Sequence, residues 1–179
     1  MIRTLFINRG KKRRSEIMSG EGAQRLQERC ETAYVEQGLA LVAEGIMPSL
    51  VENAAFASGL PKGPLAAGGE DPGKFAANTK IVAAQSVQQR LLCCQALAAA
   101  ECWEEGLTDP VEADLASTLG WGFPSYTGGV LSFIDTMGLN AFVSLCHQLS
   151  SGTQAKLKPS AWLLAKAQES DRIYKSLAK

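Results

Sequence analysis

The chain has 179 residues, of which 46% are hydrophobic and 20% charged, values typical of a globular protein with one ordinary domain or two small helical units. Its 18 basic and 18 acidic side chains give a formal net charge of zero, so overall charge gives no reason to expect nucleic acid or a membrane as a partner. Good helix formers such as alanine, leucine, glutamine and glutamate are abundant and β-branched runs are scarce, which predicts an all-α fold.

Residues 1–24 are predicted to be a basic N-terminal tail or linker. No acidic side chain occurs before Glu16, and Lys11–Arg14 is a continuous basic run. Such a run is typical of a solvated terminus, of an organelle-targeting peptide or of an arm that binds a partner such as nucleic acid. We favour the solvated terminus and expect no nucleic-acid partner.

Residues 25–68 are predicted to form a first helical unit. Apolar residues recur at helical spacing over about 24–44, which indicates a long amphipathic helix. Ser49 and Glu52 then form a capping-box pattern, with the serine at the N-cap and the glutamate reaching back. This pattern predicts a short helix that ends at Gly59.

A linker is predicted at residues 69–80, because the stretch 61–80 is rich in glycine and proline. Residues 81–179 are predicted to form a second helical unit. It opens with a long helix over about 81–105, whose apolar face is broad enough to pack against more than one neighbour.

Four further features follow in the second unit. Asp109 is an expected N-cap, because Pro110 and a glutamate at the third helical position follow it. Residues 121–129 (WGFPSYTGG) form a predicted turn, and an amphipathic helix is expected over about 139–149. Ser160 is the expected N-cap of a last helix that continues into the charged tail.

The cysteines and the single histidine do not form a metal-binding pattern. The cysteine count is odd, no C-x-x-C pair occurs, and only His147 is available to complete a ligand set. We therefore expect no metal, no disulfide framework and reduced thiols packed in the core of a cytoplasmic protein. No apolar run approaches the ~18 residues that span a bilayer, so we expect no membrane association.

The same order of features occurs twice in the chain. A helix ends in Glu-Gly at 44–45 and at 105–106, a short helix follows, and a Gly-apolar-Pro corner comes at 59–61 and 122–124. The number of residues that separates the first copy of a feature from its second copy is nearly the same for both features, and it is slightly larger for the corner than for the Glu-Gly pair. Two copies indicate a duplicated unit rather than a solenoid, which generally needs three or more repeats.

The second copy resembles the C-terminal domain of 3-hydroxyacyl-CoA dehydrogenases, above all the multifunctional fatty-acid β-oxidation enzymes that carry an enoyl-CoA hydratase. The segments that carry the resemblance are 91–106 (LLCCQALAAAECWEEG), 109–114 (DPVEAD), 120–129 (GWGFPSYTGG), 133–138 (FIDTMG) and 160–174 (SAWLLAKAQESDRIY). Two segments of the first copy are similar to the first C-terminal repeat of that family: 34–45 (YVEQGLALVAEG) and 51–65 (VENAAFASGLPKGPL).

The resemblance implies two related helical repeats with a fold like the 6-phosphogluconate dehydrogenase C-terminal domain. In such an enzyme they form the dimer or pseudo-dimer interface and one side of the acyl-CoA cleft. The implied partner is a Rossmann domain on the same or another chain, which binds NAD, and acyl-CoA binds only with that domain present. A homodimer is a further possibility.

The chain departs from the family where the chemistry is performed. A Rossmann domain needs G-x-G-x-x-G between a strand and a helix, and Gly20 and Gly22 offer neither the strand nor the third glycine. The family's catalytic His–Glu pair lies in that domain, whereas the single histidine here, His147, falls in the second helical unit. We therefore assign no catalytic or cofactor-binding residue to this chain and expect it to be inactive alone.

The turn at 121–129 supplies the only candidate contact residues. Trp121, Phe123, Pro124 and Tyr126 are candidates for touching the substrate or a partner domain. A purely structural turn, with aromatic residues covering the core, is the favoured alternative. For the whole chain, the alternative function is a free-standing helical protein-interaction module that has lost the enzymatic domain.

Overall fold

The computed structural model describes residues 20–75, 78–150, 157–169 and 172–174, so the predictions for Lys11–Arg14 and most of the basic tail lie outside the described residues. Within these ranges the chain is all-α, with no β-strand and only one isolated bridge between Ile46 and Lys80, which confirms the predicted class. The helices are α2 (Glu21–Ala43), α3 (Pro48–Ala57), α4 (Pro64–Ala67), α5 (Ala84–Glu104), α6 (Pro110–Ala116), α7 (Val130–Met137), α8 (Leu139–Ser150) and α9 (Ala161–Gln168).

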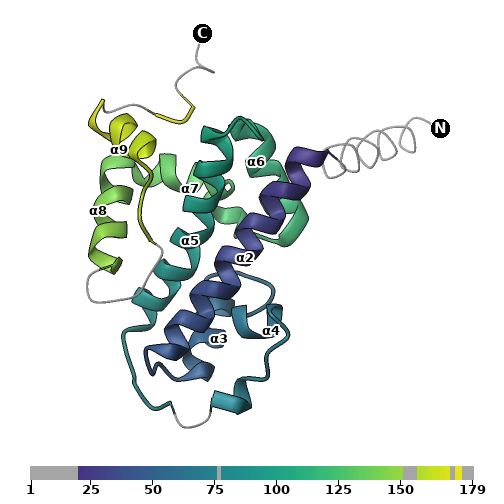
Figure 1. The fold of residues 1–179 in the computed structure, drawn as a ribbon, viewed down its shortest axis with the longest axis vertical. Helices are drawn as coiled ribbons and strands as arrows, with labels where there is room; N and C mark the ends of the chain where they lie inside the picture. Colours follow the sequence, from purple (N-terminus) through teal and green to yellow (C-terminus); the bar gives the residue numbers. More distant parts are fainter. Residues whose placement is uncertain (1–19, 76–77, 151–156, 170–171, 175–179) are drawn as a thin grey trace, which may run out of the picture.

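The two longest helices, α2 and α5, lie side by side and antiparallel at the centre of the fold (Figure 1). Both end as the sequence predicts: Glu44 and Glu105 are the C-caps, and Gly45 and Gly106 follow with φ of +87° and +73°. A positive φ suits glycine, and the last carbonyls of each helix are satisfied by the residues that follow. Helix α5 is the more deeply buried of the two, as its broad apolar face predicted.

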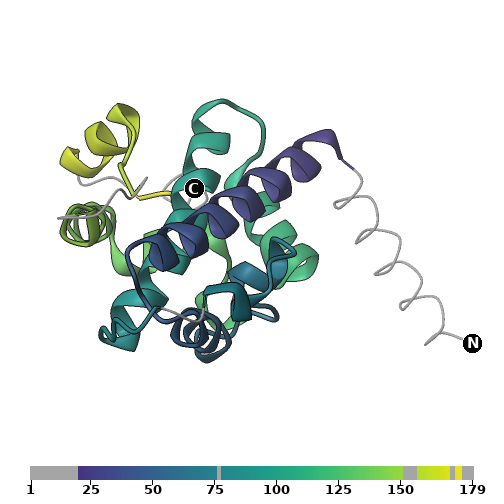
Figure 2. The ribbon, with the colours of Figure 1, turned by 60° about the horizontal axis from the view of Figure 1, so that its bottom comes forward.

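The remaining helices cover the central pair on different sides. Figures 1 and 2 show α8 and α9 on one side of α5 and α2 on the other, while α3 and α4 pack near the end of α2 and the start of α5. A short 3-10 turn (Pro72–Phe75) lies within the predicted linker 69–80, so part of that stretch has regular structure. The linker is tied down where the Lys80 amide donates to the Gly45 carbonyl at 3.0 Å.

The capping box predicted for α3 is wrong. The helix begins earlier than expected, with Met47 at the N-cap and Pro48 at the first position, and no side chain caps it. Glu52 instead accepts from the Leu65 amide at 2.9 Å, at the start of α4. A tertiary contact therefore takes the carboxylate that the local pattern had assigned to its own helix.

The caps predicted for α6 and α9 are confirmed. The Glu112 amide donates to Asp109 Oδ1 at 2.9 Å, and the Leu163 amide donates to Ser160 Oγ at 3.1 Å. Helix α6 continues into a π-helical turn (Ser117–Trp121), and a 3-10 turn (Ser125–Thr127) follows within the predicted aromatic turn.

Helix α7 was not predicted, and α9 is shorter than predicted because it ends at Gln168. Aromatic rings in this region pack edge-on: Phe133 contacts both Phe123 and Phe142, with centroids 6.1 and 6.2 Å away. No single helix among the described residues is long and apolar enough to cross a membrane. Helices α7 and α8 have that length and apolar character only when taken together, and they are bent by 101° where they meet.

Asp114 holds several elements together from a buried position on α6. Its carboxylate accepts from the Leu131 amide at 2.7 Å and from Ser132 Oγ at 2.5 Å, so it caps the start of α7. It also accepts from the hydroxyl of Tyr174, near the end of the described chain. Because a carboxylate near a helix N-terminus satisfies free amides and favours the helix dipole, Asp114 stabilises α7 directly.

We predict that Asp114→Ala lowers the free energy of unfolding by about 3 kcal/mol, because several buried donors lose their acceptor together. Asp109→Ala, the matched removal of an exposed cap at the start of the same helix, should cost about 1 kcal/mol. Urea unfolding followed by circular dichroism measures both. Equal losses would contradict the role assigned to Asp114.

Candidate functional site

The two Gly-apolar-Pro corners lie face to face, although they are far apart in the chain. A Cβ added to Gly59 would lie 3.5 Å from Pro124 Cβ, and one added to Gly122 would lie 2.9 Å from Pro61 Cγ. Each corner thus presents its glycine to the proline of the other. Both glycines have positive φ, +86° and +78°, so backbone shape and close approach both favour glycine here.

The four predicted contact residues divide between the core and the surface. Phe123 is only 1% exposed and belongs to the core, and Pro124 is buried against the opposite corner. Tyr126 is 74% exposed, with its hydroxyl donating to the Ser58 carbonyl at 3.2 Å. Trp121 is half-buried, and its Nε1 donates to Gln95 Oε1 at 3.0 Å. Trp121 and Tyr126 therefore keep surface for a ligand or partner.

Trp121 lies on the wall of an open groove of about 740 Å³ beside α2. The groove is lined by two kinds of residue: apolar groups near the corners and polar or acidic groups of α2. Tyr34 forms part of this wall and donates its hydroxyl to the Lys62 carbonyl at 2.7 Å. Burial raises the pKa of Tyr34, so this hydroxyl stays protonated and acts as a donor. Glu28, Glu31 and Glu36 outnumber Lys62, which makes the groove acidic.

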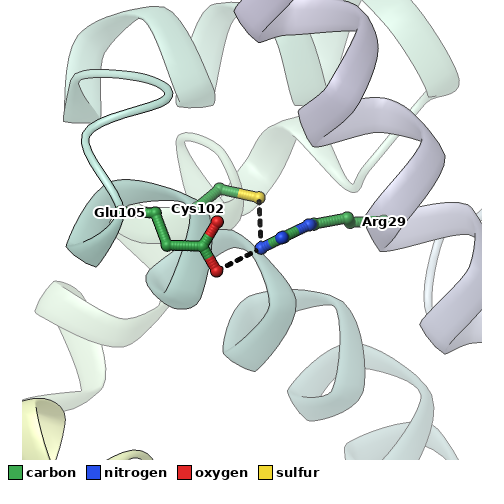
Figure 3. A network of polar contacts seen from close by, with 3 residues as sticks. All are labelled: Arg29, Cys102 and Glu105. Carbon is green, nitrogen blue, oxygen red and sulfur yellow. Dashed lines mark hydrogen bonds and ion pairs between the residues drawn. The ribbon is translucent and has the colours of Figure 1, made fainter.

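An ion pair joins the start of α2 to the end of α5. Arg29 Nη1 lies 2.7 Å from Glu105 Oε1 and 3.9 Å from Cys102 Sγ (Figure 3). The two charged side chains are 42% and 47% exposed, so solvent screens their attraction. Glu105 is the main reason that the pKa of Arg29 is raised.

A second ion pair joins the start of α5 to the end of α2. Arg90 Nη1 and Nη2 each lie 2.6 Å from one oxygen of Glu44, in a bidentate arrangement. These side chains are 5% and 16% exposed. With its amide oxygen turned toward the guanidinium, Gln37 also accepts from Arg90 Nη2 at 2.9 Å and Nε at 3.1 Å. Arg90 is therefore buried with its donors satisfied.

The two ion pairs are reciprocal in sequence. The displacement from Arg29 to Arg90 equals the displacement from Glu44 to Glu105, so the two arginines match each other and the two glutamates do as well. The arginine of each stretch thus reaches the glutamate of the other. These two ion pairs were not predicted from the sequence, although the displacement between the Glu-Gly motifs also relates Arg29 to Arg90.

The cysteine thiols and the histidine differ in their exposure. All five cysteines are free and buried, and burial raises the pKa of Cys30, Cys94 and Cys102, which keeps these thiols protonated and unreactive. His147 is exposed on α8. Within the described ranges, no three His, Cys, Asp or Glu side chains gather as metal ligands would. The exposed parts of this region are the open groove beside α2, with Trp121 on its wall, and the side chain of Tyr126.

No protein-family model matches this chain.

We predict that the two ion pairs differ in energy. Glu44→Gln should lower the free energy of unfolding by about 3 kcal/mol, because it leaves the buried Arg90 without a counter-charge. The matched change Glu105→Gln should cost less than about 1 kcal/mol, because Arg29 stays hydrated. Chemical denaturation of both variants checks this, and the prediction is wrong if Glu105→Gln is the more damaging.

Proposed function

We propose that the chain is built from two related helical units, residues 25–68 and 81–179, which close on each other about a local two-fold axis. Reciprocal contacts are what a two-fold interface produces, since residue i meets j and the partner's j meets i. The ion pairs Arg29–Glu105 and Arg90–Glu44 have this form. The opposed glycines and prolines of the two corners have it too.

The carboxylates of the two short helices support the same proposal. Glu52 of α3 accepts from the Leu65 amide at the start of α4. Asp114 of α6, which lies at the matching place in the second unit, accepts from the Leu131 amide at the start of α7. Leu65 and Leu131 are both fully buried. One structural role is thus filled twice, by different acidic residues at matching positions.

The π-helical turn accounts for part of the change in displacement between the copies. The Leu60 amide donates to the Ala55 carbonyl at 3.1 Å, five residues back, in the first corner. The Phe123 amide donates to the Ser117 carbonyl at 2.9 Å, six residues back, in the second. One extra residue fits there without altering the corner, which is how a π turn absorbs an insertion.

The function best supported by this arrangement is that of the C-terminal helical portion of an NAD-dependent 3-hydroxyacyl-CoA dehydrogenase of fatty-acid β-oxidation. The reciprocal pairing of the two units carries the proposal, because the resemblance at residues 34–65 and 91–174 implies such a duplicated domain. In this role the chain supplies the pseudo-dimer interface and one side of the acyl-CoA cleft. NAD binding and the catalytic His–Glu pair belong to a Rossmann domain on the same or another chain.

The groove beside α2 suits one wall of that cleft rather than a complete site. Trp121 and Leu60 offer apolar surface to an acyl chain or a partner domain, whereas Glu28 and Glu31 repel the phosphates of coenzyme A. Cations for those phosphates must then come from the Rossmann domain. Acyl-CoA is expected to bind only when both parts are present.

The decisive experiment combines this chain with the separately expressed hydratase and Rossmann portion of a multifunctional 3-hydroxyacyl-CoA dehydrogenase. We expect a complex that oxidises NADH when acetoacetyl-CoA is added, while the chain alone gives no heat of binding with NADH in calorimetry. Trp121→Ala should lower the rate of the mixture about tenfold, since each ~1.4 kcal/mol of lost transition-state stabilisation is a factor of ten.

Ile81→Ala is the matched control, because Ile81 is a large apolar residue that is 76% exposed and lies outside the groove. It should leave the rate unchanged. Tight NADH binding by the chain alone would overturn the proposal. Failure to associate with the Rossmann portion, combined with a stable homodimer in ultracentrifugation, would favour the free-standing interaction module.

A further inference from the structure

A second groove lies between α2 and α5. Its volume is about 760 Å³, and it shares Glu28, Thr32 and Glu36 with the first groove. The α2–α5 groove, as we call it, is lined by Glu28, Arg29, Thr32, Ala33, Glu36, Gln37, Leu39, Ala40, Cys94, Leu97, Ala98 and Glu101.

The groove is hollow because small side chains lie along both helices. Ala33 and Ala40 on α2 and Ala98 on α5 leave room above the contact, and Leu97, which is only 5% exposed, lies at the floor of the groove. Leu39 is 36% exposed and forms an apolar part of one wall of the groove.

The polar rim of the groove has an excess of negative charge. Glu28 and Glu101 lie beside one cation, Arg29, whose guanidinium already pairs with Glu105 at 2.7 Å. Partial burial raises the pKa of Glu101; Arg29 opposes this rise, and Glu105 and Glu104 add to it. A further positive charge placed at this rim would offset the repulsion among these carboxylates.

Two acidic side chains, Glu28 and Glu101, lie at the same end of the groove, because α2 and α5 run antiparallel. Leu39 and Cys94 lie toward the other end, where Glu36 is one helical turn from Leu39. A ligand that fits can therefore pair positive charge with Glu28 and Glu101 while it places apolar groups against Leu39. The span from residue 28 to residue 40 is about 18 Å at 1.5 Å per residue, which is the length of a helix of about 12 residues.

We propose that the α2–α5 groove docks a basic amphipathic helix of a partner protein, with its lysines or arginines at Glu28 and Glu101 and its apolar face against Leu39 and Leu97. Helix-in-groove recognition of this kind uses apolar anchors at helical spacing. A second copy of this chain is disfavoured, because the acidic rim would then face a rim of the same charge. The inference does not rest on the dehydrogenase proposal, because its anchors Leu39 and Glu101 line only the second groove, although Glu28 lines both.

The test uses the full chain and two synthetic helical peptides, each slightly longer than the groove. Both peptides carry a leucine stripe at helical spacing; one has lysines at one end, and the other has glutamates in their place. Fluorescence anisotropy should detect binding of the lysine peptide and none of the glutamate peptide. The double variant Glu28→Lys/Glu101→Lys should weaken lysine-peptide binding at least about tenfold, and raising the salt concentration should weaken it as well.

Glu104→Lys is the matched control, because Glu104 is exposed on the same helix but does not line the groove. It should change the affinity less than about twofold. Leu39→Ala should weaken binding without changing its salt dependence, since it removes an apolar anchor only. The proposal fails if the lysine peptide does not bind, if both peptides bind alike, or if Glu104→Lys is as damaging as the double variant. Circular dichroism verifies that each variant stays helical.

Discussion

The antiparallel contact between α2 and α5 is the constraint on which the rest of the structure depends. Small side chains lie where the two helices meet, among them Cys30 of α2 and Ala98 of α5, and the Cys30 thiol approaches the Gln95 carbonyl at 3.5 Å. This lets the backbones approach closely while the ends are fixed by ion pairs. The corners, the short helices and both grooves take their positions from this pair of helices.

The two proposed units have the same arrangement of helices and ion pairs, but the surroundings of their arginines differ. This difference follows from single side chains. Gln37 accepts hydrogen bonds from the buried Arg90. The residue at the matching position of the second proposed unit is Ala98, whose side chain has no acceptor for the exposed Arg29. The same alanine helps to leave the α2–α5 groove open. In the proposed duplication, this one difference between the units goes together with the solvent exposure of one ion pair and with the open space of the groove.

Local features could be predicted from the sequence, and long-range ones could not. The caps at Asp109 and Ser160 were predicted because a cap acts within one helical turn. Helix α7 was missed because the amides at its start are satisfied by Asp114, a residue of another helix that comes well before Leu131 in the chain. For the predicted contact residues, the sequence indicates only that the turn is rich in aromatic residues. Which of these residues faces solvent depends on how the two corners pack against each other.

The glycines before α4 and α7 could not be explained from turn patterns in the sequence alone, because each lies against an acidic side chain that caps the helix from elsewhere in the chain. Gly63 has φ of −72°, a value open to any residue, yet a Cβ there would overlap the Glu52 carboxylate. Gly129 has φ of +134°, and a Cβ there would overlap Asp114. Steric exclusion by a distant carboxylate is thus common to both sites, whereas backbone conformation favours glycine at only one of them. At Gly63 the cap rather than the backbone favours glycine, because a Cβ would push the end of the Glu52 side chain away from the Leu65 amide, whereas at Gly129 the cap and the backbone both favour it.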